Sequence, residues 1–478
     1  MKNYCPIVLS ALFAAFMLFV RLTAYEPLGK SISTYDTNAF IAAGHIPFPS
    51  PEFFISDRPA TIGLFYKLLE PDGGYQVTAL SSPAEDIYLS PAIQPGLERV
   101  ALAQGLLSIS AWILLAFVVA RKLENSGLQI VAVLLILAFG FSPTIAEWDS
   151  VLLSEPISLF LFVILLAISI ELVPRLTNPI LDSWTIFLIV AWSLVLLLWV
   201  FARDTNAYML LVLVAALLLL LILRWRLKNP GFLSKRNISI FILAMSLLFL
   251  IQSNTLQKSG RWINPFFNNI LHNVIPYPDR VAFFETKGMP INDAVLALRN
   301  SPGNEDAFFE IPELMSWTTE HGTGTYIQFL LAFPGWTFEK FIQGVEVSFS
   351  ENRQPFFVPN QERTTPALAY VGDLLHPRSS SVIWVVLVEL VAFGFLAVRS
   401  NRPVAISLFV LFTVLFIGEM LMLFVSIHGD ALGIVRHALG SVMPFRLSIW
   451  LLPLFILDLY AVPATLPQRK AVVKRIKK

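Results

Sequence analysis

The chain has 478 residues, of which 56% are hydrophobic and 14% are charged, and its mean hydropathy is +0.69. A water-soluble fold cannot bury so much apolar surface, so the composition excludes a soluble globular protein and indicates an integral membrane protein. The net charge of +1 offers no general attraction to nucleic acid, and the single cysteine, Cys5, excludes an internal disulfide and a cysteine-based metal cluster.

Ten apolar runs are candidates for membrane-spanning helices, because a span needs about 20 mostly apolar residues. The runs cover residues 5–24, 100–120, 128–141, 151–173, 184–201, 207–223, 238–251, 382–398, 404–425 and 442–462. The predicted fold class is therefore all-α: a polytopic membrane bundle of about ten helices, with extracytoplasmic interfacial helices and loops.

The short loops on one side of these runs carry lysine and arginine, which mark the cytoplasmic face. The residues concerned are Lys2, Arg121, Lys122, Arg175, Arg224, Arg226, Lys228, Lys235, Arg236, Arg399, Arg402 and the basic tail 469–478. Both termini are expected in the cytoplasm, with loops 25–99, 252–381 and 427–440 outside. The tail carries no retrieval signal, which favours the plasma membrane of a bacterium over the endoplasmic reticulum.

This layout divides the chain into three predicted regions. Residues 1–251 form an N-terminal transmembrane module that includes the first outer loop, 25–99. Residues 252–381 form an extracytoplasmic region, whose apolar segments suit the covering of a site better than a core of their own. Residues 382–478 form the last helices and the cytoplasmic tail.

Charged residues gather at the outer ends of the apolar runs. Asp36 follows the first run, in a segment too polar for lipid but apolar enough to lie at a membrane surface. The others are Asp149, Glu155, Arg203, Asp204, Asp430, Arg436 and His437. Because charges near lipid are costly and usually face a partner or a water-filled cavity, we expect all of them at one depth, near Asp36.

Carboxylates and guanidinium groups at one membrane face suit a reaction on a phosphate-bearing lipid. Arginine binds phosphate through two hydrogen bonds and keeps its charge when partly buried, so it can stabilise a phosphate leaving group. A carboxylate beside an acceptor hydroxyl can remove its proton. The pattern therefore favours transfer of a sugar from a polyprenyl phosphate, with the isoprenoid chain lying among the helices.

Four short motifs, in this order, resemble the GT-C superfamily of membrane glycosyltransferases, which use polyprenyl- or dolichyl-phosphate sugars. The motifs are Asp36 after the first helix, residues 57–60 (Asp-Arg-Pro-Ala), residues 154–156 (Ser-Glu-Pro), and the pair Arg436 and His437 in the last outer loop. The likeness covers nearly the whole chain at the level of layout. It implies an inverting transfer at the extracytoplasmic face, with a lipid, glycan or protein as acceptor and membrane lipids around the enzyme.

The resemblance assigns roles to residues of this chain. Asp36 would be the catalytic base, and the residues that bind phosphate or substrate would be Arg58, Asp149, Glu155, Arg203, Arg436 and His437. Many members of the superfamily have a second acidic residue in the first loop, whereas Thr37 and Asn38 follow Asp36 here. This departure favours a single carboxylate acting as base; a divalent metal is possible but not indicated.

Each of these residues also has a purely structural interpretation. Asp36 can cap the following helix, and Glu155 can interact with the dipole at the start of its helix. Arg58 can anchor a loop to lipid phosphates, and Arg203 can pair with its neighbour Asp204. Three acidic residues inside the later runs, Glu389, Glu419 and Asp458, have no evident partner in the sequence.

Alternative functions remain open at this level. An O-antigen ligase or polymerase type of enzyme would share the outer loop and arginines but would use a pyrophosphate-linked glycan. A flippase or transporter of lipid-linked sugars would carry polar residues through the bilayer midplane and have symmetrical halves. A structural membrane subunit would need none of this chemistry.

Overall fold

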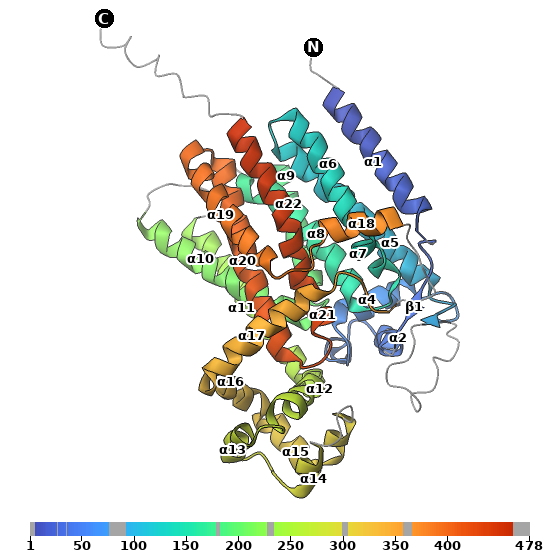
Figure 1. Cartoon of the computed structure of the whole chain (residues 1–478), viewed down its shortest axis with the longest axis vertical. Coiled ribbons are helices and arrows are strands. Elements are labelled where there is room, and N and C mark those ends of the chain that lie inside the picture. Colours follow the sequence, from blue (N-terminus) through green and yellow to red (C-terminus); the bar gives the residue numbers. More distant parts are fainter. Residues whose placement is uncertain are drawn as a thin grey trace, which may run out of the picture.

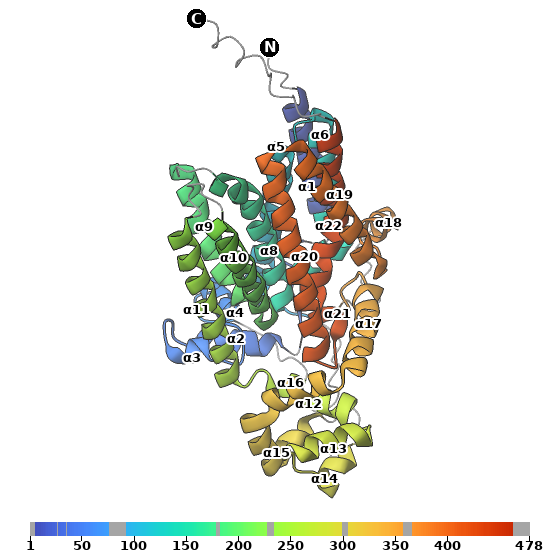
Figure 2. The ribbon, with the colours of Figure 1, turned by 90° about the vertical axis from the view of Figure 1, so that its left-hand side faces the viewer.

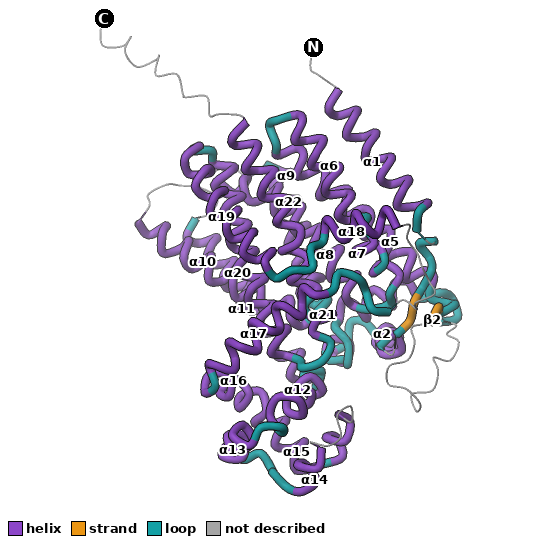
Figure 3. Tube along the Cα trace, viewed as in Figure 1, coloured by secondary structure: helices purple, strands orange, loops and turns teal. Residues whose placement is uncertain are grey.

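The computed structural model describes residues 5–25, 27–34, 36–75, 92–177, 182–226, 234–298, 305–356 and 366–461. Helices make up most of the described chain, and two short strands pair at its edge (Figures 1 and 3). The α-helices are α1 (Cys5–Thr23), α2 (Thr37–His45), α3 (Pro51–Phe54), α4 (Ala60–Leu69), α5 (Glu98–Lys122), α6 (Ser126–Gly140), α7 (Pro143–Ala146), α8 (Ser154–Leu172), α9 (Ser183–Val200), α10 (Tyr208–Arg226), α11 (Lys235–Ser259), α12 (Ile263–Asn269), α13 (Pro278–Thr286), α14 (Asp293–Ala297), α15 (Pro312–Trp317), α16 (Thr323–Ala332), α17 (Pro334–Ser350), α18 (Pro366–Leu375), α19 (Ser381–Ser400), α20 (Pro403–Gly429), α21 (Ile434–His437) and α22 (Leu439–Ala461).

Shorter elements connect these helices. The strands are β1 (Ile32–Ser33) and β2 (Ala92–Ile93); the 3₁₀ segments are η1 (Trp148–Ser150), η2 (Val173–Thr177), η3 (Asp204–Ala207) and η6 (Glu305–Glu310); the π-helical segments are η4 (Ile270–Val274) and η7 (Thr318–Gly322).

Each predicted apolar run forms a helix, namely α1, α5, α6, α8, α9, α10, α11, α19, α20 and α22. Within the described residues, eight helical segments are long and apolar enough to cross a membrane. Helix α6 with the segment Pro143–Ser150 forms a bent pair, with an angle of 46°, that would make a ninth span. The all-α prediction is confirmed, and the chain is a multi-pass membrane protein.

Helix α8 lies at the centre of the bundle. In its apolar window 78% of the residues are buried, compared with 22% in the spans that contain α10 and α11. Between Glu155 and Glu171, which have charged partners at its two ends, α8 is apolar on nearly every side and can therefore be buried all round. The outer helices instead direct apolar side chains such as Leu219 and Leu243 away from the protein, where lipid can cover them.

The charged turns of the bundle meet at one end. Glu171, near the end of α8, contacts Lys122 and Arg175, each at 2.7 Å. Arg402, in the turn between α19 and α20, pairs with Glu124 at 3.2 Å. These contacts agree with the prediction that Arg121, Lys122, Arg175, Arg399 and Arg402 lie on one side.

The last helix ends at the same place. Asp458 of α22 accepts hydrogen bonds from the backbone N–H groups of Glu124 and Asn125, at 2.9 and 2.8 Å, which gives this buried carboxylate its partner. The start of α1 also lies at this end (Figures 1 and 2). Of the basic residues predicted here, Lys2, Lys228 and 469–478 lie outside the described residues.

A separate helical layer covers the opposite end of the bundle (Figure 2). It contains α12 to α16 and has a hydrophobic cluster of its own, distinct from that of the bundle. Phe267 stacks on Phe308 with ring centroids 4.8 Å apart, and Phe284 packs on Phe329 at 5.3 Å. The expectation that this region would not form its own core is wrong, because its aromatic side chains pack on one another.

Candidate functional site

The first outer loop is attached to the segment that opens α8. Strand β1 pairs antiparallel with β2, and on its other side Ile32 accepts a hydrogen bond from the Leu152 N–H at 2.9 Å. The Thr37 hydroxyl donates to the Leu152 carbonyl at 3.2 Å. These bonds place Asp36 beside the start of α8, where Glu155 lies.

Asp36 lies between two arginines from distant parts of the chain. Its Oδ1 accepts a hydrogen bond from Arg58 Nη2 at 2.7 Å, and its Oδ2 accepts one from Arg436 Nη1 at 3.1 Å. Only 7% of Asp36 is exposed. The residue occupies the N-cap position of α2, but its side chain makes no capping hydrogen bond. The interpretation of Asp36 as a helix cap is therefore wrong.

Glu155 forms the second half of the site. Arg436 Nε lies 3.2 Å from Glu155 Oε1, and Arg203 Nη2 lies 3.6 Å from the same oxygen. Arg436 thus connects the two carboxylates through different nitrogens. Among the residues that these contacts join, three guanidinium groups face two carboxylates, which leaves one positive charge in excess.

Packing between helices fixes the positions of the arginines. Thr61, in the first turn of α4, donates its N–H to Phe201 O at 3.1 Å and its hydroxyl to Leu198 O at 2.7 Å. This joins the start of α4, next to Arg58, to the end of α9, next to Arg203. Arg436 lies in α21, which follows Gly433; the φ of 61° at Gly433 is one that glycine adopts without strain.

Burial is the main electrostatic influence on Arg203. Loss of water lowers the pKa of this guanidinium, the carboxylate of Glu155 raises it, and the charge of Arg436 lowers it again. Arginine remains charged even so, because its ordinary pKa is above 12. Arg203 is therefore a cation that has lost much of its hydration and gains from an anionic partner.

Two of the predicted site residues have partners elsewhere. Asp149 pairs with Arg21 Nη2 at 2.9 Å, and both are buried, so the expectation that its carboxylate joins Asp36 needs correction. The reason is that α1 passes the α7–η1 segment and brings Arg21 to Asp149. His437 points to Asp430, with its Nε2 3.4 Å from Asp430 Oδ2. His437 thus lies beside the site without contacting Asp36.

Arg261 is a residue of this end of the bundle that sequence reasoning missed. It binds Asp204 at 2.8 and 3.1 Å and donates to the Ser56 carbonyl at 2.7 Å, next to the segment that holds Arg58. Asp204 therefore pairs with Arg261 in place of its neighbour Arg203. The predicted apolar run before Arg261 ends at residue 251, so Arg261 does not directly follow it as Arg203 follows the run 184–201, and its position gave no such signal.

A small cavity opens from the site into the bundle. It is lined by Glu155, Ser158, Leu159, Phe162, Trp199, Arg203, Leu439 and Gly440. A second cavity, lined mainly by apolar residues, continues along α8 and α22 and shares Phe162 with the first. Both cavities are small, about 10 Å³ each, and Phe162 is the residue that lines both.

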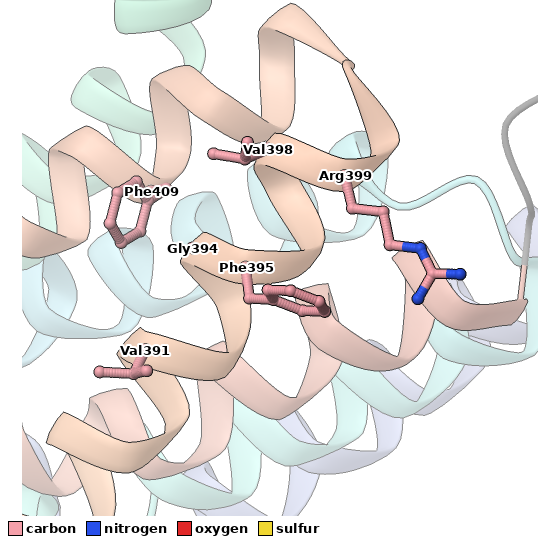
Figure 4. A pocket seen from close by; sticks show the side chains of 6 residues that line it. All are labelled: Val391, Gly394, Phe395, Val398, Arg399 and Phe409. Carbon is pink, nitrogen blue, oxygen red and sulfur yellow. The ribbon is translucent and has the colours of Figure 1, made fainter.

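A larger cavity lies away from this site. It has a volume of about 540 Å³ and lies between α19 and α20, lined by Val391, Gly394, Phe395, Val398, Arg399 and Phe409 (Figure 4). Val391, Phe395 and Val398 are exposed on the surface of the bundle. The cavity is therefore an open, mainly apolar depression on the outside of two membrane-spanning helices.

Within the described ranges, no group of three or more His, Cys, Asp and Glu side chains could hold a metal ion. The side chains at Asp36 offer guanidinium donors and two carboxylates, an arrangement that can hold a phosphate group and accept a proton.

No protein-family model matches the chain, and no curated protein sequence matches it. Among solved structures, it is similar to an archaeal oligosaccharyltransferase, AglB from Archaeoglobus fulgidus, in complex with an inhibitory peptide and a dolichol-phosphate: 12% identity and a TM-score of 0.42 over 93% of this chain and 50% of that one. The apo form of the Archaeoglobus fulgidus oligosaccharyltransferase gives 10% identity and a TM-score of 0.41, with the same coverage. The chain thus spans about half the length of the solved structures that it matches.

Proposed function

We propose that the protein is a membrane glycosyltransferase that moves a sugar from a polyprenyl phosphate to an acceptor at the extracytoplasmic face. The observation that carries the proposal is the group of Asp36, Glu155, Arg58, Arg203 and Arg436, with one positive charge in excess. Asp36, Glu155 and Arg203 are buried, and Arg58 and Arg436 are partly exposed. Excess guanidinium charge at such a site favours an anion, and the planar guanidinium matches the geometry of phosphate.

Asp36 acts as the base in this proposal. It takes the proton of the acceptor hydroxyl while the acceptor oxygen attacks the anomeric carbon of the sugar. The bond between that carbon and the phosphate oxygen breaks, and the electron pair leaves with the polyprenyl phosphate. Arg58 and Arg436, which contact Asp36, would turn toward the phosphate of the donor and stabilise its charge.

The isoprenoid chain of the donor would lie along the apolar side chains of α8 and α22 that begin beside Glu155 and Arg203. These side chains include Phe162, Leu166, Phe445 and Leu452. The two cavities among them measure about 10 Å³ each, so the helices would have to move apart to admit the chain. Apolar side chains next to the charged site favour a lipid-linked donor over a soluble one.

Exchange of Asp36 for asparagine tests the proposal, because it removes the charge with little change of shape. The full-length protein in lipid nanodiscs would be incubated with radiolabelled polyprenyl-phosphate sugars and, separately, pyrophosphate-linked glycans, with and without a chelator. Asp36→Asn should lower sugar release at least about a hundredfold, the usual size of a base's contribution.

The matched control is Asp57→Asn, since Asp57 lies in the same loop, is exposed and should tolerate the change. Turnover that survives Asp36→Asn would refute the role of the base. Sugar release from the pyrophosphate-linked glycan alone would identify a ligase. In that case the three arginines of the site would bind the two phosphate groups of the donor. Loss of sugar release by the wild type in the presence of the chelator would show that a divalent metal takes part.

A further inference from the structure

A cluster of two cations and aromatic rings lies where the outer layer of α12 to α16 meets helix α17, apart from Asp36. The guanidinium carbon of Arg280, in α13, lies 3.7 Å from the ring centroid of Tyr277 and 4.7 Å from that of Trp336. Lys340 Nζ, in α17, lies 5.3 Å from the same Trp336 ring. Two positive charges thus share one aromatic side chain.

Neutral groups hold both cations in place. Lys340 Nζ donates to Asn269 Oδ1 at 3.0 Å, and Arg280 Nη1 donates to Asn273 O at 2.7 Å. The Asn273 amide donates in turn to Asn269 Oδ1 at 2.9 Å. Within the part of the chain that the structure describes, neither cation has a carboxylate within 4.0 Å.

The carboxylate that attracts Lys340, Asp430, already has other partners. Asp430 Oδ1 accepts hydrogen bonds from Asn268 Nδ2 at 2.8 Å and from Leu432 N at 2.9 Å. Its Oδ2 lies 3.4 Å from His437 Nε2. Asp430 attracts Lys340 from a distance without forming an ion pair with it.

Holding the two cations together has an electrostatic cost. Burial lowers the pKa of Lys340 to about 8; Asp430 raises this pKa, and the charge of Arg280 lowers it. An anion between Lys340 and Arg280 would remove the repulsion. The stacked position of Arg280 suits such a ligand, because aromatic rings on its faces leave the N–H groups at its edge free to donate.

The cluster is connected to the site around Asp36. His437, which contacts Asp430, follows Arg436 in α21, and Arg436 binds Asp36. Asn268, which also binds Asp430, precedes Asn269, the partner of Lys340. A substrate that extends from Asp36 over the outer layer would reach the two cations.

We propose that Arg280 and Lys340 bind an anionic group, a carboxylate or a phosphate, carried by the substrate that reacts at Asp36. The link to the substrate rests on the proposed glycosyl transfer, whereas the binding of the anion does not. An acidic sugar in the glycan and a phosphate on a lipid are the two sources of such a group, and Arg280 and Lys340 would make the enzyme prefer a charged substrate over a neutral one.

The test measures the titration of Lys340 itself. The lysines of the full chain, in nanodiscs of zwitterionic lipid, would be labelled by reductive methylation with ¹³C and observed by NMR, and a Lys340→Arg variant assigns the signal. The pH titration is repeated with sodium glucuronate, with inorganic phosphate, with glucose as an uncharged control, and in nanodiscs that contain an anionic phospholipid.

An anion that binds should raise the titration midpoint of Lys340 by about one pH unit or more, while glucose leaves it unchanged. In Arg280→Gln the midpoint without anion should already be higher, and the response to anions should be lost. Lys287, which is exposed and lies 5.7 Å from the Phe283 ring in the same layer, serves as control in the same spectra.

Each result decides the proposal. A response to glucuronate alone identifies an acidic sugar as the source, and a response to phosphate or anionic lipid identifies a phosphate group. No response to any anion, an equal response of Lys287, or a full response in Arg280→Gln would overturn the site. Because no turnover is measured, loss of the transferase proposal through Asp36→Asn would leave this result intact.

Discussion

Arg436 holds both carboxylates of the site through two different nitrogens. Its Nη1 contacts Asp36 at 3.1 Å and its Nε contacts Glu155 at 3.2 Å. Lysine offers a single compact ammonium group, which cannot occupy both positions at once. The spacing of donors on the guanidinium, as well as its charge, is therefore what this position requires.

Arg436→Lys tests that requirement. We expect the variant to lose about tenfold or more in kcat/KM for the lipid-linked donor, because a charge-assisted hydrogen bond contributes about 1.5–3 kcal/mol and one of the two is lost. Steady-state kinetics of the protein in nanodiscs measure this change in kcat/KM. The control, Arg378→Lys, alters a half-exposed pair with Asp373. Equal activity in the two variants would contradict the bridging role.

Helix α17 crosses α20 at a glycine. A Cβ at Gly344 would lie 2.4 Å from Ile427 Cγ2, whereas a Cβ at Gly335 of the same helix would meet nothing within 4 Å. The β-branched Ile427 has little freedom to move aside. The close approach of α17 to α20, which holds the outer layer beside the bundle, thus depends on the missing side chain at Gly344.

Gly344→Ala should lower the free energy of unfolding by about 1–3 kcal/mol, because overpacking forces side chains and backbone apart. Thermal unfolding of the purified protein measures the change. Gly335→Ala is the matched control and should leave the unfolding temperature unchanged or raise it slightly, since alanine favours a helix over glycine. An unchanged unfolding temperature in Gly344→Ala would show that the two helices can separate freely.

Lys340, also in α17, predicts a dependence of stability on pH. Its pKa falls from an ordinary 10.5 to about 8 in the folded protein, through burial and the charge of Arg280, against the attraction of Asp430. Between these two values the unfolded chain binds more protons than the folded one. The free energy of unfolding contributed by Lys340 therefore rises as the pH rises from about 8 to 10.5.

Thermal unfolding across this pH range, with Lys340→Met as reference, isolates the effect. The stability of the wild type should increase relative to the variant as the pH rises. Lys287→Met, an exposed lysine of the same layer, should give a constant difference. A wild-type stability that falls relative to Lys340→Met would contradict the assignment.

Charge is segregated over the whole molecule. One end of the bundle carries the paired turns around Glu171 and Glu124, and the other carries Asp36, Glu155 and the outer layer. Because basic short loops stay on the cytoplasmic side, we propose that the Asp36 end faces away from the cytoplasm.

Labelling of single cysteines tests this orientation. With Cys5 replaced by serine, Asp57→Cys should react with a membrane-impermeant maleimide in intact cells, and Arg399→Cys should react only after the membrane is opened. Both positions are exposed, so accessibility within the protein does not separate them. The reverse pattern would place the site in the cytoplasm.

The pattern of apolar and charged residues is enough to predict the class of fold and the end of the molecule that holds the candidate site. Long apolar runs must become helices, because lipid offers no partner for backbone N–H and C=O groups. The same reasoning made charged residues at the ends of these runs, such as Asp36, Arg58 and Glu155, candidates for the site, since charge next to lipid is costly.

The packing of the helices determines which charged side chains form pairs. Asp149 pairs with Arg21, 128 positions away, and Asp204 pairs with Arg261 rather than with its neighbour Arg203. Asp36 meets Arg436 from the other end of the chain. An ion pair depends on a few ångströms between side chains, and those distances are set by how the helices pack, which the pattern of apolar and charged residues along the chain does not specify.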